Sequence, residues 1–540
     1  MSNTTKKEKK KEFTFIQYAN GKSLEEINGT VRVPHGAHFW RTLLAYTGPG
    51  ALVAVGYMDP GNWSTDITGG QNFGYLLISV IVISGLIAML LQYMSAKLGI
   101  VTQMDLAQIM RASSTKVLGF IMWILTELAI MATDIAEVIG AAIALNLLFH
   151  IPMVVAVLLT AFDVLLLLLL TKIGFRKIEA LVACLITVIL LVFIYQVWLS
   201  KPNWAHIMAG FIPVPKVMAS SPSIGGDTPL TASLGIIGAT VMPHNLFLHS
   251  SISQARELDY SKPEDLKQSV RFTTWDSNIQ LTIATVVNVL LLITGVAVFK
   301  SGAIKDPSFF GLYQALNTPS SVNNSILADV SRKGILGFLF AIALLASGQN
   351  STITGTLTGQ IIMEGFVHMH IPMWARRLIT RFLAIVPVIA CVILTSSSSP
   401  LQEHIALNDL MNNSQVFLAL DLPFAMLPLL MLTNSEKEMR QYKNTMWVKI
   451  LGWISVIGLV YLNVMGLPTQ MAAFFSDNPT KAELATGADI AYIVDIFMFL
   501  LLIWMFIEIK IHLKNSGYRD LTKTVGVIEK KEDKIKKSEE

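Results

Sequence analysis

Two interruptions in long apolar runs carry the residues of this sequence that could do chemistry. The interruptions read Gly56-Tyr57-Met58-Asp59-Pro60-Gly61-Asn62 and Ala239-Thr240-Val241-Met242-Pro243-His244-Asn245. Each places a proline in the middle of an apolar run, beside side chains that can bind a cation. Because proline lacks an amide donor and clashes with the preceding turn, we expect both helices to unwind there. Unwound backbone at membrane depth is tolerated only where it is buried in protein or lines a cavity.

Together the interruptions offer a mixed set of oxygen and sulfur donors. Asp59 has an anionic carboxylate, Asn62 a neutral amide oxygen and Met242 a thioether, and unwinding frees the carbonyl of Ala239. Oxygen donors alone would suit Mg²⁺ or Ca²⁺, whereas a sulfur donor favours softer transition-metal ions. An isolated aspartate at the bilayer centre costs about 2.5–3.5 kcal/mol on insertion scales, so we expect Asp59 to meet a cation.

Each of these residues also has a simpler structural interpretation. A lone methionine in an apolar helix is usually a packing residue, and a lone proline usually only kinks its helix. A buried aspartate in a membrane span is functional more often than not. The joint occurrence of aspartate, asparagine and methionine at two interruptions favours one metal site over three unrelated structural roles.

The composition of the chain places these interruptions in a bilayer. Of its 540 residues, 53% are hydrophobic and only 14% are charged, and the mean hydropathy is +0.56, whereas a soluble chain is about 25% charged. The Lys-rich N-terminus reaches no long apolar stretch until about Leu43, so we interpret it as a cytosolic tail close to anionic lipid, not as a signal peptide. Cys184 and Cys391 lie inside apolar runs, and we expect no disulfide.

About twelve apolar runs are long enough to cross a bilayer, which takes roughly 20 residues per helix. The runs are Leu43–Trp63, Phe73–Ala96, Ile121–Phe149, Pro152–Leu170, Leu181–Leu199, Leu234–Ile252, Leu281–Phe299, Ile335–Gly365, Leu378–Leu394, Val416–Leu432, Val448–Met465 and Ile490–Ile507. Lys and Arg gather in the even-numbered loops and in both tails, and positive charge marks the cytosolic side. We therefore expect a multi-pass plasma-membrane protein with both termini in the cytosol.

The interrupted runs are the first and the sixth, so each opens a unit of five spans. Because five is odd, the two units have opposite topology. Interrupted segments at corresponding positions of two such repeats point to the midplane site of a transporter. The predicted organisation is a basic cytosolic tail (1–40), a first five-helix repeat (41–200), a second, inverted repeat (231–433), two additional spans (446–511) and a charged cytosolic tail (512–540).

Three motifs of the chain resemble the signatures of a known family. The motifs are Asp59-Pro60-Gly61-Asn62, Met242-Pro243-His244-Asn245 and Gly348-Gln349-Asn350-Ser351-Thr352-Ile353-Thr354-Gly355-Thr356 with Gly359-Gln360. They are similar to those of the natural resistance-associated macrophage protein (Nramp) family of metal–proton symporters, in its bacterial manganese-transporter branch, over roughly residues 40–465. The resemblance implies an all-α integral membrane protein of the leucine-transporter-type fold, with two inverted five-helix repeats plus two further helices. It also implies that Asp59, Asn62, Met242 and the Ala239 carbonyl coordinate the metal.

Two residues depart from the family pattern. Asn350 stands where the family usually has Ser, and Asp421 stands where Gln is expected. An extra carboxylate at that position could add a proton site or alter local helix packing. By contrast, Ser414-Gln415-Val416 fits the pattern, and the resemblance implies that Gln415 is a metal ligand in one conformation.

Carboxylates of the third span suggest a route for protons beyond Asp59. Asp134 and Glu137 are three residues apart, so they lie on one helical face. Within an apolar run such a pair indicates a proton relay or a cavity lining, and the alternative is a structural ion pair. Among the other embedded polar residues, we interpret Asp163 as structural, leave Asp276 open and place Asn288 along the permeation route.

Histidines and arginines near these segments could take part in the same traffic. Histidine titrates near neutrality, so His244 and His249 suit proton transfer, but either could equally hold the unwound segment through hydrogen bonds. Arg376 and Arg377 open the ninth span. Either could be an ordinary positive-inside anchor, and the resemblance implies that one pairs with the carboxylate route.

The features above predict a symporter that imports Mn²⁺, Fe²⁺ or similar ions with protons, by alternating access around a fixed midplane site. Metal ion and proton are its substrates and lipid surrounds it. We expect no cofactor and no nucleic-acid partner. The sequence has no Gly-x-x-x-x-Gly-Lys-[Ser/Thr] loop for nucleotide. Because transport makes and breaks no covalent bond, we expect that the protein is not an enzyme.

Three other functions were weighed against this prediction. A sodium-coupled amino-acid transporter on the same fold would bind a carboxylate through bare amides of the first helix, where Asp59 would repel it. An intramembrane metalloprotease would need a His-Glu-x-x-His element, and no span carries one. A passive metal channel would conduct without a proton gradient, and only transport measurements separate it from a symporter.

Overall fold

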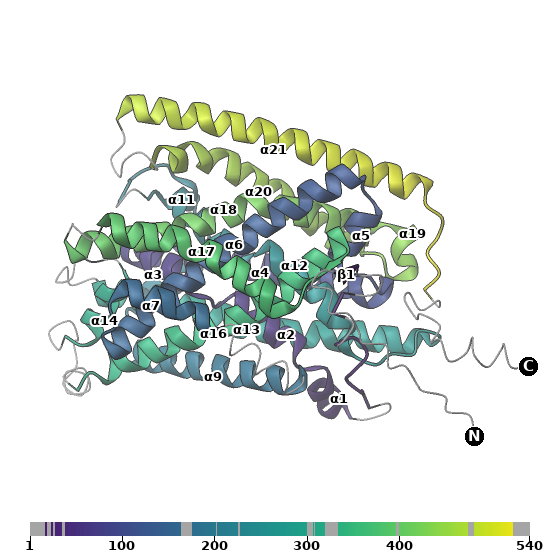
Figure 1. The fold of residues 1–540 in the computed structure, drawn as a ribbon, viewed down its shortest axis with the longest axis horizontal. Helices are drawn as coiled ribbons and strands as arrows, with labels where there is room; N and C mark the ends of the chain where they lie inside the picture. Colours follow the sequence, from purple (N-terminus) through teal and green to yellow (C-terminus); the bar gives the residue numbers. More distant parts are fainter. Residues whose placement is uncertain are drawn as a thin grey trace, which may run out of the picture.

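The described part of the chain consists almost entirely of helices that run along one common direction (Figure 1). The computed structural model describes residues 17–18, 23–24, 27–34, 38–163, 175–200, 202–224, 227–299, 306, 308–318, 333–395, 399–473 and 480–521. The only strands within these ranges are β1 (Gln17–Tyr18) and β2 (Met369–His370), which pair antiparallel. The prediction of an all-α fold is confirmed.

The helices of the first half of the chain include both predicted interruptions. They are α1 (Phe39–Tyr46), α2 (Pro49–Gly56), α3 (Pro60–Phe73), η1 (Gly74–Leu77), α4 (Ile78–Thr102), α5 (Leu106–Ala112), α6 (Lys116–Phe149), α7 (Met153–Leu159), η2 (Thr160–Phe162), α9 (Phe175–Ser200), α10 (Trp204–Gly210), η3 (Pro215–Met218), α11 (Pro229–Thr240), α12 (Pro243–Ile252) and η4 (Ser253–Ala255).

The second half contains the longest helices. They are α13 (Pro263–Phe299), α14 (Phe309–Leu316), α16 (Ile335–Ile362), the short π-helical turn η6 (Met363–Val367), α17 (Met373–Thr395), α18 (Pro400–Asn434), α19 (Glu436–Met439), η7 (Arg440–Tyr442), α20 (Met446–Ala473) and α21 (Lys481–Asn515).

Ten helical segments of the described residues are long and apolar enough to cross a membrane. They account for ten of the twelve predicted runs. The other two are the first run, which is divided among α1, α2 and α3, and the fourth, of which α7 and η2 are described while residues 164–170 lie outside the described ranges.

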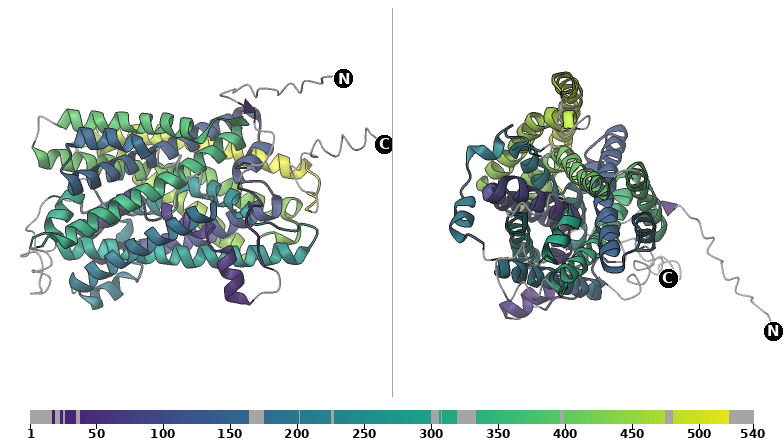
Figure 2. Two further views of the ribbon diagram at one scale, coloured as in Figure 1. Left: turned by 60° about the horizontal axis from the view of Figure 1, so that its bottom comes forward. Right: turned by 90° about the vertical axis from the view of Figure 1, so that its left-hand side faces the viewer.

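The interrupted helices lie at the centre of the bundle, and the last two helices lie at its edge. In the most apolar window of Pro229–Ala255, which includes α11 and α12, 89% of the residues are buried by other parts of the protein, against 33% in that of Ala482–Asn515. Figure 2, right, looks along the helices and shows α20 and α21 at one edge. Large apolar side chains such as Trp447, Ile454, Ile493 and Leu500 are exposed on this pair, as expected for a surface that faces lipid.

Helices α3 and α13 approach so closely that their main chains touch. A Cβ atom added at Gly70 of α3 would overlap the carbonyl oxygen of Leu292 in α13. A Cβ atom added at Gly295 of α13 would overlap the carbonyl oxygen of Ile67 in α3. Glycine is therefore required at both positions, because any side chain would push the helices apart.

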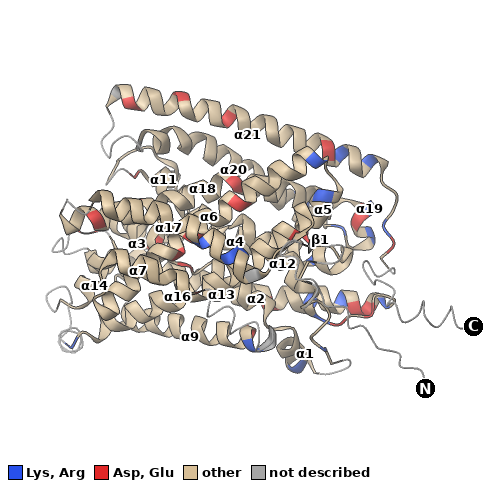
Figure 3. Ribbon diagram, viewed as in Figure 1, with Lys and Arg blue, Asp and Glu red and all other residues tan. Residues whose placement is uncertain are grey.

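Charged residues are distributed unequally between the two ends of the bundle. Figure 3 shows Lys and Arg gathered around α5, α19 and the last turns of α21, at the end where α1 also lies. The apolar middle of the bundle shows few charges, and these are buried. One end of the bundle is thus richer in Lys and Arg than the other, as the two sides of a membrane protein commonly are.

Candidate metal-binding site

The first predicted interruption is a break between α2 and α3. Helix α2 ends at Gly56, and Asp59 adopts an extended conformation (φ −75°, ψ 170°) directly before Pro60, the first residue of α3. Asp59 caps α3, because its Oδ1 accepts a hydrogen bond from the N–H of Asn62 at 2.9 Å. The capping bond uses one carboxylate oxygen and leaves the other for a further partner.

The unwound segment before Asp59 is fixed by its neighbours. The carbonyl of Met58 accepts hydrogen bonds from the indole N–H of Trp63, at 3.0 Å, and from the hydroxyl of Ser347 in α16, at 2.5 Å. A backbone group freed by the break is thereby satisfied within the protein, which unwinding at membrane depth requires.

The second predicted interruption is a break between α11 and α12. Helix α11 ends at Thr240, and Met242 is extended (φ −74°, ψ 128°) directly before Pro243, the first residue of α12. Ala239 lies four residues before Pro243, which has no N–H, so the Ala239 carbonyl loses its donor of the helical ladder. The ends of α2 and α11 also carry the partial negative charge of a helix C-terminus, which attracts a cation.

Asn245 of α12 connects the two breaks on one side. An added Cβ atom at Gly56, the end of α2, would overlap the side-chain amide of Asn245. The Nδ2 of the same amide lies 3.8 Å from the sulfur of Met242. One side chain therefore touches both breaks, which brings the first close to the Met242 thioether.

Gln415 of α18 connects the two breaks on another side. An added Cβ atom at Gly61, next to Asn62, would overlap the side-chain amide of Gln415. An added Cβ atom at Gly238, next to Ala239, would overlap the Gln415 carbonyl. Gln415 thus lies between the first turn of α3 and the last turn of α11, where the sequence pattern expected an occasional ligand.

The oxygens of these residues form a buried donor set without partners. Asp59, Asn62 and Gln415 are at most 1% exposed. Asp59 Oδ2, Asn62 Oδ1 and Gln415 Oε1 have no hydrogen-bond partner among the described residues. Buried polar atoms are normally satisfied by a partner, and these three oxygens have the chemistry to bind a cation. No group of three His, Cys, Asp or Glu side chains suited to a metal occurs in the described ranges, and the donor set here has one carboxylate with amides and a thioether instead.

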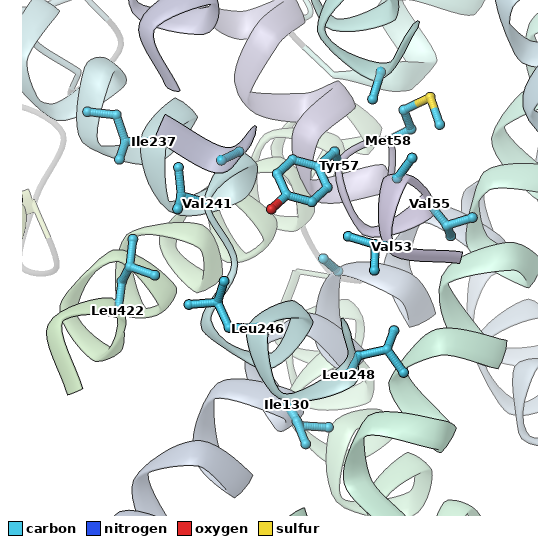
Figure 4. Packing of buried hydrophobic residues seen from close by; sticks show 14 of the residues in the cluster. Val53, Val55, Tyr57, Met58, Ile130, Ile237, Val241, Leu246, Leu248 and Leu422 are labelled. Carbon is cyan, nitrogen blue, oxygen red and sulfur yellow. The ribbon is translucent and has the colours of Figure 1, made fainter. Parts of the chain in front are cut away.

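Met242 differs from the other buried methionines near the breaks. Its side chain is fully buried, yet it is not a member of the contiguous hydrophobic cluster that the described residues form. Met58, in the first break, does belong to that cluster, and Figure 4 shows it packed with Val53 and Val55. Met242 is thus a buried methionine outside that cluster, with its sulfur beside the amide of Asn245.

A second polar chain ties the first break to α12. The hydroxyl of Tyr57, which Figure 4 shows turned towards the space between the breaks, accepts a hydrogen bond from Gln92 Nε2 at 2.9 Å. Gln92 Oε1 lies 3.0 Å from Nδ1 of His249. His249 thus has a structural partner, whereas Nδ1 of His244, buried beside Met242, has none within the described part of the chain.

The carboxylates of α6 lie in a buried network with arginines of α17. Arg377 forms ion pairs with Asp134 and, at 2.8 Å, with Glu137, and lies 3.4 Å from Asp163. Arg381, one turn further along α17, pairs with Asp163 and lies 3.6 Å from Glu137. Asp163, interpreted from the sequence as structural, belongs to this network. Three carboxylates face two guanidinium groups, so the cluster has one carboxylate in excess.

Arg376 points to a different partner. Its Nη2 lies 2.6 Å from Glu127, whose side chain remains 17% exposed. Glu127, Asp134 and Glu137 follow one another along α6, and Gly140, one turn further, lies against Pro60 of the first break. The acids of α6 therefore form a series that leads away from the metal-binding candidates.

The structure also assigns places to the remaining sequence candidates. Asp276 accepts hydrogen bonds from the N–H groups of Gly48 and Gly50 at 3.2 and 2.8 Å, so it caps α2. Asn288 is buried, and its Oδ1 has no partner in the described segments.

Sequence reasoning did not single out several buried polar residues beside the site. Arg381 could have been found from its position four residues after Arg377, on the same helical face. Asp66, buried seven residues after Asp59, could have been found in the same way. Tyr57 and Gln92 gave no signal, because a single polar residue in an apolar run has many explanations.

Comparison with known proteins places the chain in a family. The model of the natural resistance-associated macrophage protein-like (Nramp) family matches residues 50–469. The chain belongs to the Nramp family. It is 54% identical over 464 residues to the divalent metal cation transporter MntH of Latilactobacillus sakei, which covers 86% of this chain and 98% of that protein. The expectations of an Nramp resemblance and of a transporter rather than an enzyme agree with these findings.

Solved structures confirm the fold expected for an Nramp chain. The Eremococcus coleocola manganese transporter is 64% identical and superposes with a TM-score of 0.86, covering 91% of this chain and all of that one. Mhp1, a nucleobase-cation-symport-1 family transporter, has the same fold at 13% identity, with a TM-score of 0.50 over 91% of this chain and 96% of its own. The leucine-transporter-type architecture is thus shared across distant transporters.

The two departures from the Nramp pattern both lie in the interior. Asp421 in α18 is 5% exposed, and Asn350 in α16 is 1% exposed. Asp421 Oδ1 and both polar side-chain atoms of Asn350 have no hydrogen-bond partner in the part of the chain that the structure describes.

Proposed function

We propose that this chain is a proton-coupled symporter that imports Mn²⁺, and Fe²⁺ or similar transition-metal ions, across the plasma membrane. One observation carries the proposal: two helices break at the centre of the bundle, and their breaks bring together unpartnered buried oxygens and a thioether outside the hydrophobic cluster. Membership of the Nramp family supports it, because relatives carry the names divalent metal cation transporter and manganese transporter.

In this proposal the metal ion binds between the breaks. Asp59 supplies the one anionic oxygen, Asn62 and the Ala239 carbonyl supply neutral oxygens, and Met242 supplies sulfur. Gln415 lies against both breaks and joins the ligand set in one conformation. Sulfur weakens the site for Ca²⁺ and Mg²⁺ relative to Mn²⁺ and Fe²⁺, because hard cations prefer oxygen.

Protons move through the acids that extend from the first break. Asp59 and His244 lie next to the metal, and Glu137 and Asp134 follow along α6. The network of Arg377 and Arg381 holds one carboxylate more than it can pair, so it has a place for a proton. Arg376 with Glu127 lies at the exposed end of this series, and His249 acts mainly as a partner of Gln92.

The uneven charge of the two ends supports an orientation with both termini in the cytosol. Lys and Arg gather at the end that carries α1 and the last turns of α21 (Figure 3). Helices α3 and α11 lead from the breaks to the opposite end (Figure 1). Metal therefore enters along α3 and α11 and leaves along α2 and α12 when one repeat rocks against the other.

Uptake into proteoliposomes tests this function. Mn²⁺ uptake should rise with an inward proton gradient and be inhibited by Fe²⁺ more than by Ca²⁺, and Asp59→Asn should abolish it. Equal uptake with and without a proton gradient would indicate a channel. Uptake of an amino acid driven by Na⁺, with none of Mn²⁺, would contradict the proposal.

A pair of methionine variants tests the role of sulfur. Met242→Ala should keep some Mn²⁺ uptake but lose about tenfold of its discrimination against Ca²⁺, which corresponds to about 1.4 kcal/mol. Met58→Ala is the matched control: it removes an equally buried methionine one residue from Asp59, which should cost about 2–5 kcal/mol of stability and leave selectivity unchanged. Unchanged selectivity in Met242→Ala would show that the thioether is no ligand.

A further inference from the structure

A polar pocket opens beside the candidate metal site. Its walls come from α3, α11, α18 and α20, so it lies on the side of the breaks away from α1 and the end of α21 (Figure 1). Most of its lining side chains carry hydroxyl, amide or carboxylate groups, among them Thr65, Thr231, Asn412 and Gln470. Such a lining suits water and hydrated ions better than an apolar ligand.

Residues that line the pocket are close in sequence to the proposed ligands. Thr65 is three residues beyond Asn62 on α3, and Val416 directly follows Gln415 on α18. Gly235 lies one helical turn before Ala239 on α11, with no side chain to narrow the passage. On three helices, residues that line the pocket therefore lie within about one helical turn of a proposed ligand.

Asp227 is the one ionisable residue in the lining of this pocket, as far as the described residues form it. It lies two residues before Pro229, the first residue of α11, and the hydroxyl of Thr231 lies 3.5 Å from its Oδ1. The N-cap of α11 is Thr228, not Asp227, so the helix has its cap without this carboxylate. A structural role remains available to Asp227, because any carboxylate near a helix N-terminus is stabilising.

We propose that Asp227 and this pocket form a capture site, which holds the divalent cation, still carrying waters of its shell, before it reaches Asp59. The inference rests on the proposed function and assigns it a first binding step. The polar lining can replace part of the hydration of the ion, because hydroxyl, amide and carboxylate oxygens are ligands for hard divalent cations. Hydroxyl and amide groups of the walls hydrogen-bond to the shell, and the carboxylate raises the local concentration of the cation.

The test compares Mn²⁺ uptake by Asp227→Asn and wild type in cells, with surface expression measured. Loss of one charge about 5 Å from a dication should raise KM roughly five- to twentyfold at low ionic strength. The maximal rate should stay within about twofold, and the KM difference should shrink strongly in 0.5 M salt because added ions screen a charge in a pocket that opens to solvent. Asp227→Glu should restore KM.

Two further variants separate capture from folding and from general surface charge. Glu403→Gln is the matched control, because it removes one negative charge from the first turn of α18, outside the pocket, and should leave KM unchanged. Asn412→Asp adds a charge inside the pocket while keeping the oxygen that accepts a hydrogen bond from Ser64, at 2.6 Å, so it should lower KM. This second variant decides the matter even where Asp227→Asn fails to fold.

Several results would overturn the capture site while leaving the proposed function intact. They are an unchanged KM in Asp227→Asn, a KM change that persists in high salt, and an Asp227→Glu variant as impaired as Asp227→Asn. An Asn412→Asp variant with unchanged or higher KM would also overturn it. Absence of Mn²⁺ uptake by the wild-type chain would instead contradict the proposed function.

Discussion

The buried network of α6 and α17 should respond differently to the loss of an arginine and to the loss of a carboxylate. Arg377 is 1% exposed in its side chain and pairs with Asp134 and Glu137. With Asp163 and Arg381, the network contains three carboxylates and two guanidinium groups. Removing a guanidinium should therefore harm the protein more than removing a carboxylate, although both are equally buried.

The magnitudes follow from the pairing. Arg377→Gln leaves three carboxylates with Arg381 alone, and loss of one partner of a buried ion pair costs about 3–5 kcal/mol. Glu137→Gln leaves two carboxylates with two arginines, and the amide oxygen can still accept the hydrogen bond of Ser351 at 2.5 Å. We expect that change to cost about 1–2 kcal/mol at most, the range of a weakened hydrogen bond.

Thermal unfolding in detergent, followed by fluorescence-detected size exclusion, measures the difference. Arg377→Gln should melt well below wild type and Glu137→Gln close to it, and the double variant should be more stable than the sum of the two by about 0.5–3 kcal/mol. Arg376→Gln is the control, because its partner Glu127 stays partly solvated and should tolerate the loss. The reasoning fails if Glu137→Gln destabilises the protein as much as Arg377→Gln does.

Two further predictions concern the first turn of α3 and the N-terminus of α5. Gly61→Ala should displace the Gln415 amide and lower Mn²⁺ affinity with little loss of stability. Gln415→Ala in the same chain should relieve the clash. Unchanged Mn²⁺ binding in Gly61→Ala would contradict the placement of Gln415. Burial raises the pKa of Asp105, outside the spans, to about 7. A carboxyl whose pKa is higher in the folded than in the unfolded protein stabilises the fold at acid pH and loses that contribution as pH rises from about 4 to 7, by about 4 kcal/mol over this range. Asp105→Asn, which keeps the N-cap of α5, should therefore flatten the fall in melting temperature between pH 5 and pH 7.5, and an unchanged slope would argue against the shift.

Much of the fold was predictable because the bilayer restricts the choices. Apolar runs gave the positions of the spans, and proline in the middle of two runs gave the breaks that the structure places before Pro60 and Pro243. Since the breaks open the first and sixth runs, the sequence also indicated that they would lie together. In the structure the breaks do lie together, because Asn245 and Gln415 each contact both of them.

The contacts within the site could not be predicted in the same way. Helix periodicity gives the face of a residue but not the neighbour that the face meets, so the pairing of Arg376 with Glu127 and of Arg377 with Asp134 was undetermined. Asp163 was interpreted as structural, but its ion pairs with Arg377 and Arg381 could not be predicted from one acid in an apolar run. The pocket around Asp227 is formed by four helices distant in sequence, and no local pattern signals it.

The touching main chains of α3 and α13 restrict how the transport cycle can proceed. At Gly70 and Gly295 no side chains separate α3 from α13, so the two helices cannot easily slide past each other. In the proposed transport cycle a tilt of α3 would therefore move α13 with it, and the bend would lie at the unwound residues beside Asp59. The same two glycines would thus transmit a local bend beside Asp59 to the whole of the 37-residue helix α13.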